Sequence, residues 1–359
     1  MKIRSVRTWK ENLDLSKPYT IAYKTIDHVD NLFVVIELEN GIIGVGSGSP
    51  AEFVTGENIH ASALALADLA EGLLLGQDIR HYKRLIREAA AQLPGRPASL
   101  AAIDIALHDA FAQLLGLPLA DYLGRVYNGF PTSITIGIQS LEQTLEDARA
   151  FVADGFRVIK LKTGVSAEHD IETFSRLRET VGPDITIRVD VNQGYQTSDL
   201  LHFAKAVKHL NVEFYEQPLP PNLLDDMLAL PSDLRALCAA DEDLLTVEDA
   251  VQMAHHPQPY GIYNIKLMKC GGVDHGVKIA EVAEMAGIHL MWGCNDESVV
   301  SISAALHAAL ASPNTRYIDL DGSFDLARDI AQGGFVLRDG CLYDNGKPGL
   351  GVELLAASL

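Results

Sequence analysis

The sequence predicts an α/β protein built on a parallel (β/α) barrel, with an α+β unit ahead of the barrel. Three observations lead to this prediction. The chain has 359 residues, which accommodates a barrel of about 200 to 250 residues and a second unit. Short β-branched runs alternate with amphipathic stretches after residue 132, and strands precede helices in the first 125 residues.

The first 125 residues are expected to form the α+β unit. Residues 3–13 and 33–50 have the composition of strands, and Asn40–Gly41 is typical of a tight hairpin turn. Residues 57–123 are rich in Ala and Leu with helical periodicity, which is interrupted near Leu93–Gly95. Strands followed by helices therefore begin the chain.

The rest of the chain predicts the barrel. Each short run ends in polar residues and is followed by an amphipathic stretch, as in a parallel barrel. After the last run, hairpin-like segments are expected to return to the N-terminal unit. The predicted division is 1–125, 126–321 and 322–359. The eight predicted strands are 133–138, 156–162, 185–191, 212–216, 238–241, 262–267, 289–294 and 316–321.

Charge and composition exclude several classes of partner. A net charge of −19 disfavours nucleic acid and anionic lipid. No run of 18 apolar residues and no N-terminal signal segment are found, so no membrane partner and a cytoplasmic location are expected. Barrel enzymes often assemble, so a homo-oligomer stays open. No C-x-x-C pair predicts a zinc or redox site among the four cysteines, Cys238, Cys270, Cys294 and Cys341.

Five charged residues follow the strand repeat. Lys162, Asp190, Glu216, Asp241 and Lys266 are 28, 26, 25 and 25 residues apart, and each lies at or near the end of a predicted strand. Equivalent positions on successive barrel strands face the same mouth, where barrel enzymes keep their chemistry. We therefore expect these side chains to meet.

Three of these residues are carboxylates. Grouped together they repel one another, so they need a cation or raised pKa values. Oxygen ligands favour Mg²⁺ or the alternative Mn²⁺ over zinc. Taken singly, each of Asp190, Glu216 and Asp241 could instead cap the helix after its strand.

The lysines predict proton transfer. Lys160 and Lys162 are two residues apart on one strand and point into the barrel, while Lys266 lies across it. An ion pair with the carboxylates is the alternative explanation. A metal that binds a substrate carboxylate stabilises the enediolate formed by loss of the neighbouring proton. An amine on each face of this intermediate favours racemisation or epimerisation, whereas a single base favours elimination or cycloisomerisation.

Five motifs carry a resemblance: KLK (160–162), RVDVNQGY (188–195), FYEQPL (214–219), AADEDL (239–244) and NIKLMKCGG (264–272). Together they resemble the muconate-lactonising subgroup of the enolase superfamily. The resemblance implies a (β/α)7β modified TIM barrel with an α+β capping domain, formed by the N-terminal segment and the C-terminal tail. It implies that Asp190, Glu216 and Asp241 are metal ligands, that Lys162 and Lys266 are the acid/base pair, and that Lys160 acts electrostatically.

The last predicted strand ends in a second acidic pair. Asp319 and Asp321 share one face by alternation. Their D-x-D motif resembles the dipeptide epimerases, which implies binding of the substrate α-ammonium group. The same resemblance makes Thr135 a hydrogen-bond partner for the peptide. N-succinylamino acid racemases and o-succinylbenzoate synthases, the alternatives, act on substrates without this ammonium group.

The side-chain preference rests on three residues. Asp296, after the seventh predicted strand, favours a Lys or Arg side chain. Lys24, on a capping-domain loop, resembles the basic residue of Ala-Glu epimerases and favours an acidic one. Glu52 is a further candidate specificity residue. The sequence thus predicts an isomerase, a Mg²⁺-dependent dipeptide epimerase that inverts the second α-carbon, with a preference for cationic dipeptides and an Ala-Glu-type epimerase as the alternative.

Overall fold

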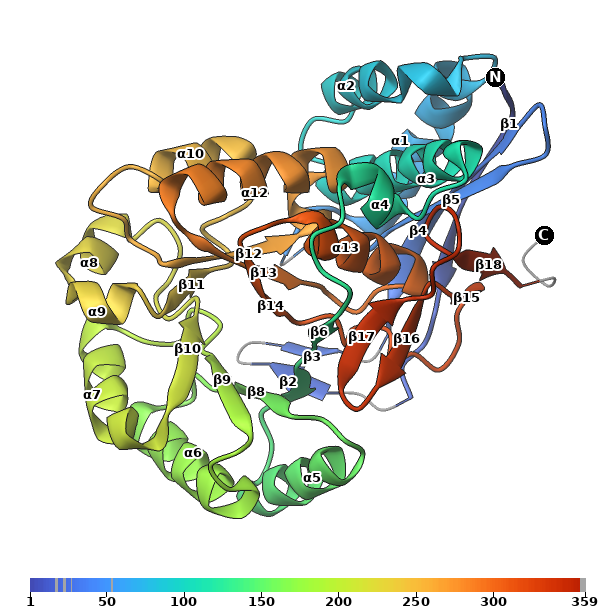
Figure 1. The fold of residues 1–359 in the computed structure, drawn as a ribbon. Helices are drawn as coiled ribbons and strands as arrows, with labels where there is room; N and C mark the ends of the chain where they lie inside the picture. Colours follow the sequence, from blue (N-terminus) through green and yellow to red (C-terminus); the bar gives the residue numbers. More distant parts are fainter. Residues whose placement is uncertain (17–18, 22–23, 27, 53, 356–359) are drawn as a thin grey trace.

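The structure, a computed structural model, describes residues 1–16, 19–21, 24–26, 28–52 and 54–355; for 19–21 and 24–26 it describes the backbone alone. Eight parallel strands form one curled sheet in chain order, which confirms the predicted barrel (Figure 1). A parallel bridge between Thr132 and Ile318 joins its two edges. The strands are β7 (Ile134–Ile136), β8 (Val158–Lys162), β9 (Thr186–Asp190), β10 (Val212–Glu216), β11 (Cys238–Ala240), β12 (Ile262–Lys266), β13 (His289–Gly293) and β14 (Thr315–Ile318).

Helices connect successive barrel strands on the outside of the sheet. In the described part of the chain β14 is followed by turns and short strands, so the order is the (β/α)7β order that the resemblance implies. The helices are α5 (Leu141–Ala153), α6 (Ala167–Val181), α7 (Thr197–Val207), η2 (Lys208–Leu210), α8 (Leu224–Ala229), α9 (Ser232–Arg235), α10 (Val247–Met253), α11 (Leu267–Cys270), α12 (Val273–Ala286) and α13 (Val299–Ala311).

A three-stranded antiparallel sheet begins the chain, with the order β1 (Ile3–Asn12), β4 (Asp30–Leu38) and β5 (Ile43–Gly48). The turn predicted at Asn40–Gly41 is confirmed: it joins β4 to β5, and Gly41 has a φ of +85°. The short strands β2 (Tyr19–Ile21) and β3 (Lys24–Ile26) pair separately. Lys24 therefore lies in a strand rather than in the expected loop.

The helical part of this unit follows the prediction with one addition. The break near Leu93–Gly95 separates the second helix from the third, as expected. A further break at 75–78, absent from the prediction, separates the first two helical segments. The elements are α1 (Ile59–Leu74), η1 (Ile79–His81), α2 (Tyr82–Gln92), α3 (Pro97–Leu115) and α4 (Leu119–Leu123).

Helix α3 packs directly on β5 because the facing strand residues are glycines. A Cβ at Gly46 would lie 1.9 Å from the Ala102 carbonyl oxygen, and a Cβ at Gly48 would lie 2.1 Å from that of Ala98. These distances are far inside van der Waals contact, so no side chain fits between strand and helix. The contact fixes the segment after Gly48 relative to α3.

The same helix also contacts the barrel. The Asp104 side chain of α3 accepts hydrogen bonds from the backbone N–H groups of Val273 (2.6 Å) and Asp274 (3.2 Å) at the start of α12. By length and composition α3 could cross a membrane, and 78% of its most apolar window is buried within the protein. Burial of this kind is typical of a core helix. One helix thus sets the position of the N-terminal sheet against the barrel.

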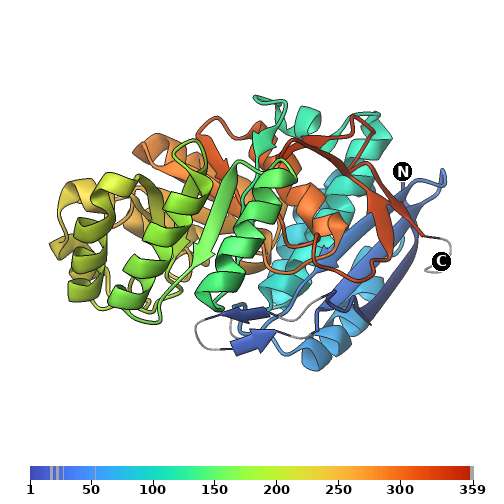
Figure 2. The same cartoon turned by 90° about the horizontal axis from the view of Figure 1, so that it is seen from below.

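The C-terminal tail contacts the N-terminal unit, as predicted. Leu350 N–H donates to Asp109 on α3 (2.8 Å), and Gly349 N–H donates to the Leu117 carbonyl (2.9 Å). Figure 2 shows the dark-blue first strand and the red C-terminal strands at this end of the molecule. The division of the chain at residues 125 and 321 stays a prediction. The remaining strands are β6 (Phe130–Pro131), β15 (Ala331–Gly333), β16 (Phe335–Arg338), β17 (Cys341–Asp344) and β18 (Val352–Leu354).

Candidate active site

The carboxyl ends of the barrel strands hold the residues predicted from their spacing. Lys162, Asp190, Glu216 and Lys266 end β8, β9, β10 and β12, and Asp241 directly follows β11. Lys162 is in register with Asp190, and Asp190 with Glu216. All five side chains therefore belong to one mouth of the barrel.

The Lys160 ammonium group connects two of the carboxylates with the acidic pair after β14. Its Nζ lies 2.9 Å from Asp190 Oδ2, 2.9 Å from Glu216 Oε2 and 2.8 Å from Asp319 Oδ2. The contact with Glu216 Oε2 is an ion pair without hydrogen-bond geometry, since that buried oxygen receives no hydrogen bond. Lys160 is buried, and a buried cation needs such partners.

The two candidate acid/base lysines lie on opposite sides of the barrel. Strands β8 and β12 are four positions apart in the eight-stranded order, and both lysines line the same cavity. Lys162 Nζ donates to Asp190 Oδ2 (2.7 Å) and Lys266 Nζ to Asp241 Oδ2 (2.8 Å). Burial disfavours the charge of Lys266, but Asp241 and Glu216 outweigh this effect and raise its pKa.

Two further residues hold the carboxylates and were not predicted. Lys269 Nζ donates to the Asp241 carboxylate and to the Asn264 carbonyl oxygen (3.1 Å). Asn264 Nδ2 donates to Glu216 Oε1 (2.8 Å). Strand alternation could have identified Asn264, which lies two residues before Lys266 and so on the same face of β12.

The carboxylates differ in charge state because their neighbours differ. Burial opposes ionisation of Asp190, but the ammonium groups of Lys160 and Lys162 outweigh it and lower its pKa to about 2. Burial and the charge of Asp190 raise the pKa of Glu216 to about 8, which Lys160 offsets only in part. Glu216 is therefore the carboxylate of this group that lacks sufficient positive charge.

These residues suit a hard divalent cation. Among the described residues, no three or more His, Cys, Asp or Glu side chains already surround a single point; lysine ammonium groups contact Asp190, Glu216 and Asp241 instead. All three side chains offer carboxylate oxygens, which Mg²⁺ prefers. The buried Glu216 Oε2 without a hydrogen bond is a ready acceptor for such an ion.

The two aspartates of the D-x-D motif have different surroundings. Asp319 accepts hydrogen bonds from Lys160 Nζ (2.8 Å) and from Ser133 Oγ. Asp321 accepts from the backbone N–H of Thr135 (2.8 Å). Burial and the charge of Asp319 raise the pKa of Asp321 to about 7. The structure thus brings the predicted pair and Thr135 together, but the two acids are not equivalent.

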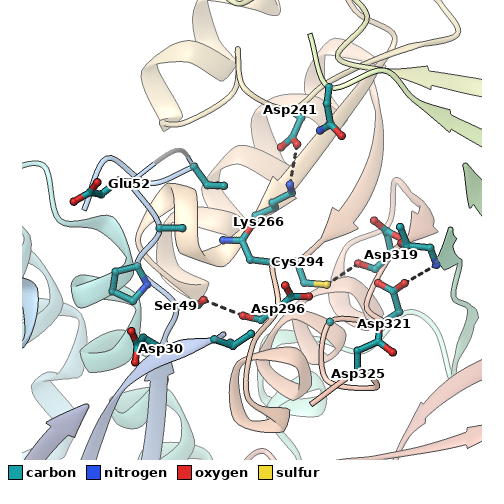
Figure 3. Close-up of a pocket in the computed structure, with 18 of the residues that line it drawn as sticks. Asp30, Ser49, Glu52, Asp241, Lys266, Cys294, Asp296, Asp319, Asp321 and Asp325 are labelled. Carbon is teal, nitrogen blue, oxygen red and sulfur yellow. Dashed lines mark hydrogen bonds and ion pairs between the residues drawn. The ribbon is translucent and has the colours of Figure 1, made fainter. Parts of the chain in front are cut away.

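A cavity of about 310 Å³ joins these groups to the capping segment, residues 49–52 and 54–59. Asp296 lies beside this segment, whose Ser49 Oγ donates to the Asp296 carbonyl oxygen (2.9 Å), and Glu52 lies at its outer edge (Figure 3). Asn58 Nδ2 donates to Glu52 Oε1 (2.8 Å). The Lys24 side chain lies outside the described residues. The acidic residues lining the cavity are Asp30, Glu52, Glu57, Asp241, Glu242, Asp296, Asp319, Asp321 and Asp325.

Comparisons with known proteins agree with this arrangement. The family described as mandelate racemase / muconate lactonizing enzyme, N-terminal domain, matches residues 3–124, and enolase C-terminal domain-like matches residues 143–358. An L-Lys-D/L-Arg epimerase from Desulforapulum autotrophicum is 54% identical over 98% of this chain and 99% of its own. A hydrophobic dipeptide epimerase from Enterococcus faecalis is 35% identical over 98% of this chain and all of its own.

A solved structure is similar over the whole fold. The dipeptide epimerase from Methylococcus capsulatus, in complex with Mg and the dipeptide L-Arg-D-Lys, superposes with a TM-score of 0.96 at 51% identity. The match covers 98% of this chain and 99% of that one. The fold therefore has a close counterpart that was solved with Mg and a dipeptide.

Proposed function

This chain belongs to the mandelate racemase / muconate lactonizing enzyme family, and from that premise we propose that it is a Mg²⁺-dependent epimerase of cationic dipeptides. The reaction inverts the α-carbon of the second residue. The observation that carries the proposal is that Lys162 and Lys266 line one cavity from opposite sides of the barrel. The acidic lining of that cavity supports the substrate class.

The lysines act as the acid/base pair. A substrate α-carbon between β8 and β12 has one amine on each face, so Lys162 and Lys266 can remove a proton from one side and return one on the other. This is the geometry that inversion requires. Lys160, which lies on β8 two residues before Lys162 and is paired with Asp319, adds a fixed positive charge beside the planar intermediate.

Asp190, Glu216 and Asp241 are the proposed Mg²⁺ ligands. When bound, the ion supplies positive charge beside the substrate carboxylate and so lowers the cost of removing the neighbouring proton. Asn264 donates a hydrogen bond to Glu216 and Lys269 donates one to Asp241. These contacts orient the carboxylates that are the proposed ligands. The relatives with Mg in their solved structures support this assignment.

The remaining groups account for the ends of a dipeptide. The α-ammonium group meets the acidic pair after β14, where Asp321 lacks a cationic partner strong enough to lower its pKa. An N-succinylated substrate has no ammonium group and would leave this buried acid without one. Thr135, on β7, donates its backbone N–H to Asp321 and lines the cavity. Its side chain is therefore in reach of the peptide group of a bound dipeptide.

Acidic residues around the cavity favour cationic side chains. Asp30, Glu52, Asp296 and Asp325 all line it in addition to the proposed metal ligand Asp241. The 54% identical relative acts, by its name, on Lys- and Arg-containing substrates. An Ala-Glu-type preference would require a basic group in the same region, and the candidate for it, Lys24, has its side chain outside the described residues. We therefore assign Asp296 to the cationic side chain, with Glu52 as a weaker contributor.

Proton exchange in D₂O tests the proposal. Wild-type protein with Mg²⁺ is incubated with Lys-Arg, Arg-Lys, Leu-Tyr, Ala-Glu and N-succinyl-Arg, and deuterium at each α-carbon is measured by NMR. We expect exchange at the second α-carbon of the cationic dipeptides, and loss of that exchange with EDTA. Exchange of none of these compounds would reject the epimerase, and exchange of Ala-Glu alone would reject the cationic preference.

A cytoplasmic location and a homo-oligomeric state also stay part of the proposal. The four cysteines are all free, which supports a reducing compartment. Size-exclusion chromatography with light scattering tests the assembly directly.

A further inference from the structure

A chain of buried polar contacts links Arg188 on β9 to Lys160 on β8 through Ser133 and Asp319. Arg188 Nη1 donates to Ser133 Oγ (3.1 Å), Ser133 Oγ donates to Asp319 Oδ1, and Lys160 Nζ donates to Asp319 Oδ2 (2.8 Å). All four residues are at most 3% exposed. Since Ser133 accepts from Arg188, its own single proton is directed to Asp319.

Arg188 cannot readily turn away from Ser133. Its Nη1 also donates to the Ile318 carbonyl (2.6 Å), and its Nε donates to Glu213 Oε2 (2.7 Å). The guanidinium group lies 5.3 Å and 5.2 Å from the ring centres of Phe214 and Tyr317. The two rings are neighbours, with centres 5.0 Å apart, so they pack together against one side of the guanidinium group. A planar cation held by hydrogen bonds at its edge and by packed rings has a defined orientation, which in turn defines the orientation of Ser133 and Asp319.

Lys160 is shared among three carboxylates, and two of them are proposed ligands of Mg²⁺. Its Nζ lies at nearly equal distances, 2.9, 2.9 and 2.8 Å, from Asp190, Glu216 and Asp319. Once Asp190 and Glu216 bind an ion, Asp319 is the partner that Lys160 retains. A buried ammonium group without that partner would be costly, and would compete for Asp190 and Glu216.

We propose that Ser133 and Arg188 are positioning residues that orient the Asp319 carboxylate toward Lys160. Lys160 then keeps a counter-charge when Asp190 and Glu216 bind Mg²⁺. This inference rests on the proposed function for the role of the metal. It also distinguishes the two acids of the D-x-D motif: Asp319 contacts Lys160, whereas Asp321 accepts a hydrogen bond from the Thr135 backbone.

The test compares Ser133→Thr with Ser133→Val, which have nearly the same shape and differ by the hydroxyl group. Mg²⁺ affinity of metal-stripped protein is measured by calorimetry without substrate. Removal of a group that orients a metal site weakens affinity by about tenfold, so we expect S133V to bind Mg²⁺ about tenfold more weakly than S133T. Equal affinities would overturn the inference. S133A serves if the extra methyl group prevents folding, with weaker binding than wild type expected.

Two further readouts distinguish positioning from general damage. With a cationic dipeptide, kcat should be lower for S133V than for S133T while KM stays within about twofold. Arg188→Lys should act in the same direction, and the R188K/S133V double variant should lose no more than the worse single variant, because both act through Asp319. Independent, additive losses would contradict the chain of contacts.

The outcomes separate the two proposals. If wild-type protein binds Mg²⁺ but exchanges no dipeptide proton, the epimerase is rejected while the calorimetric comparison still decides the role of Ser133. If wild type exchanges protons and the Thr and Val variants do not differ, the positioning role alone is rejected.

Discussion

The barrel mouth and the capping segment line one cavity but hold their side chains differently. At the mouth, Lys162 and Lys266 are fixed by ion pairs of 2.7 and 2.8 Å to carboxylates on parallel strands. On the capping segment, Glu52 is bound by Asn58 of the same segment (2.8 Å). We infer that the mouth supplies the chemistry and the segment adjusts the fit, so substitutions should matter less with distance from the strand ends.

The largest effect is expected for the acid/base lysines. Lys266→Ala and, separately, Lys162→Ala should lower kcat/KM for epimerisation about 10²- to 10⁴-fold, because each removes a proton carrier. NMR exchange rates starting from each epimer measure the loss. Lys278→Ala, which removes a lysine paired with Asp274 on α12, is the matched control and should stay near wild type. Comparable activity in all three variants would remove the distinction between the two regions.

The next effect concerns the substrate ammonium group. Asp321→Asn should raise KM for cationic dipeptides about 10- to 100-fold, since it replaces a charge-assisted contact by a neutral one. Steady-state kinetics measure the change. Asp184→Asn, just before β9 and thus at the opposite end of the barrel, removes the same charge as a control. A KM that responds equally to both substitutions would show that total charge, not contact, determines binding.

A smaller effect is expected at Asp296, which adjoins both regions. Asp296→Asn should reduce the preference for a second-residue Lys over Leu by about tenfold, the size of one partly exposed charge contact. The ratio of kcat/KM values for the two dipeptides measures it. An unchanged ratio would show that Asp296 does not recognise the cationic side chain, and that another acid of the cavity does.

A pH-dependent effect is expected at the junction of barrel, α4 and tail. Burial lowers the pKa of His307 to about 4 from its ordinary 6.5, and its Nδ1 accepts from the Ala120 N–H (3.1 Å). Between these values the unfolded chain binds a proton that the native chain does not, so the free energy of unfolding falls as pH decreases, by about 1.4 kcal/mol per unit.

Denaturant unfolding of wild type and His307→Asn at pH 7, 6 and 5 measures this dependence. In the variant, the slope of the unfolding free energy against pH should be smaller by the equivalent of about one proton. His202→Asn, at an exposed histidine on α7, should leave that slope unchanged. Parallel slopes in wild type and H307N would assign the acid sensitivity to other groups.

The smallest effect is expected on the capping segment. Glu52→Gln should change KM for cationic dipeptides by no more than about twofold, as an exposed charge at the rim contributes little. The same steady-state assay decides this. A tenfold change would show that the capping segment determines recognition as strongly as the barrel.

Most of the fold could be predicted because its pattern is local. Each barrel strand is a short β-branched run, and the repeat of about 25 residues fixes which ends meet at the mouth. The gathering of Lys162, Asp190 and Lys266 follows from that repeat alone. The strand pair β2–β3 could not be predicted in this way, since strands of three residues have too little pattern.

The partners of each charged group could not be predicted, because they depend on contacts between strands distant in the chain. Asp319 and Asp321 look alike in sequence, yet one is bound to Lys160 and the other to a backbone N–H of β7. Likewise, nothing in the motif around Lys266 indicates that Lys269 folds back on Asp241. The alternation of side chains along a strand predicts the face on which a residue lies. It does not predict which side chain on that face becomes its partner.

The bare backbone of β5 has a consequence for how such an enzyme could change its substrates. Gly46 and Gly48 lead directly into Ser49–Glu52 of the capping segment, which lines the cavity, while α3, packed on these glycines, is bound to the barrel through Asp104. A methyl group at Gly46 would push β5 away from α3 and so shift the capping segment. Residues that never meet a dipeptide could thus widen or narrow the range of dipeptides accepted.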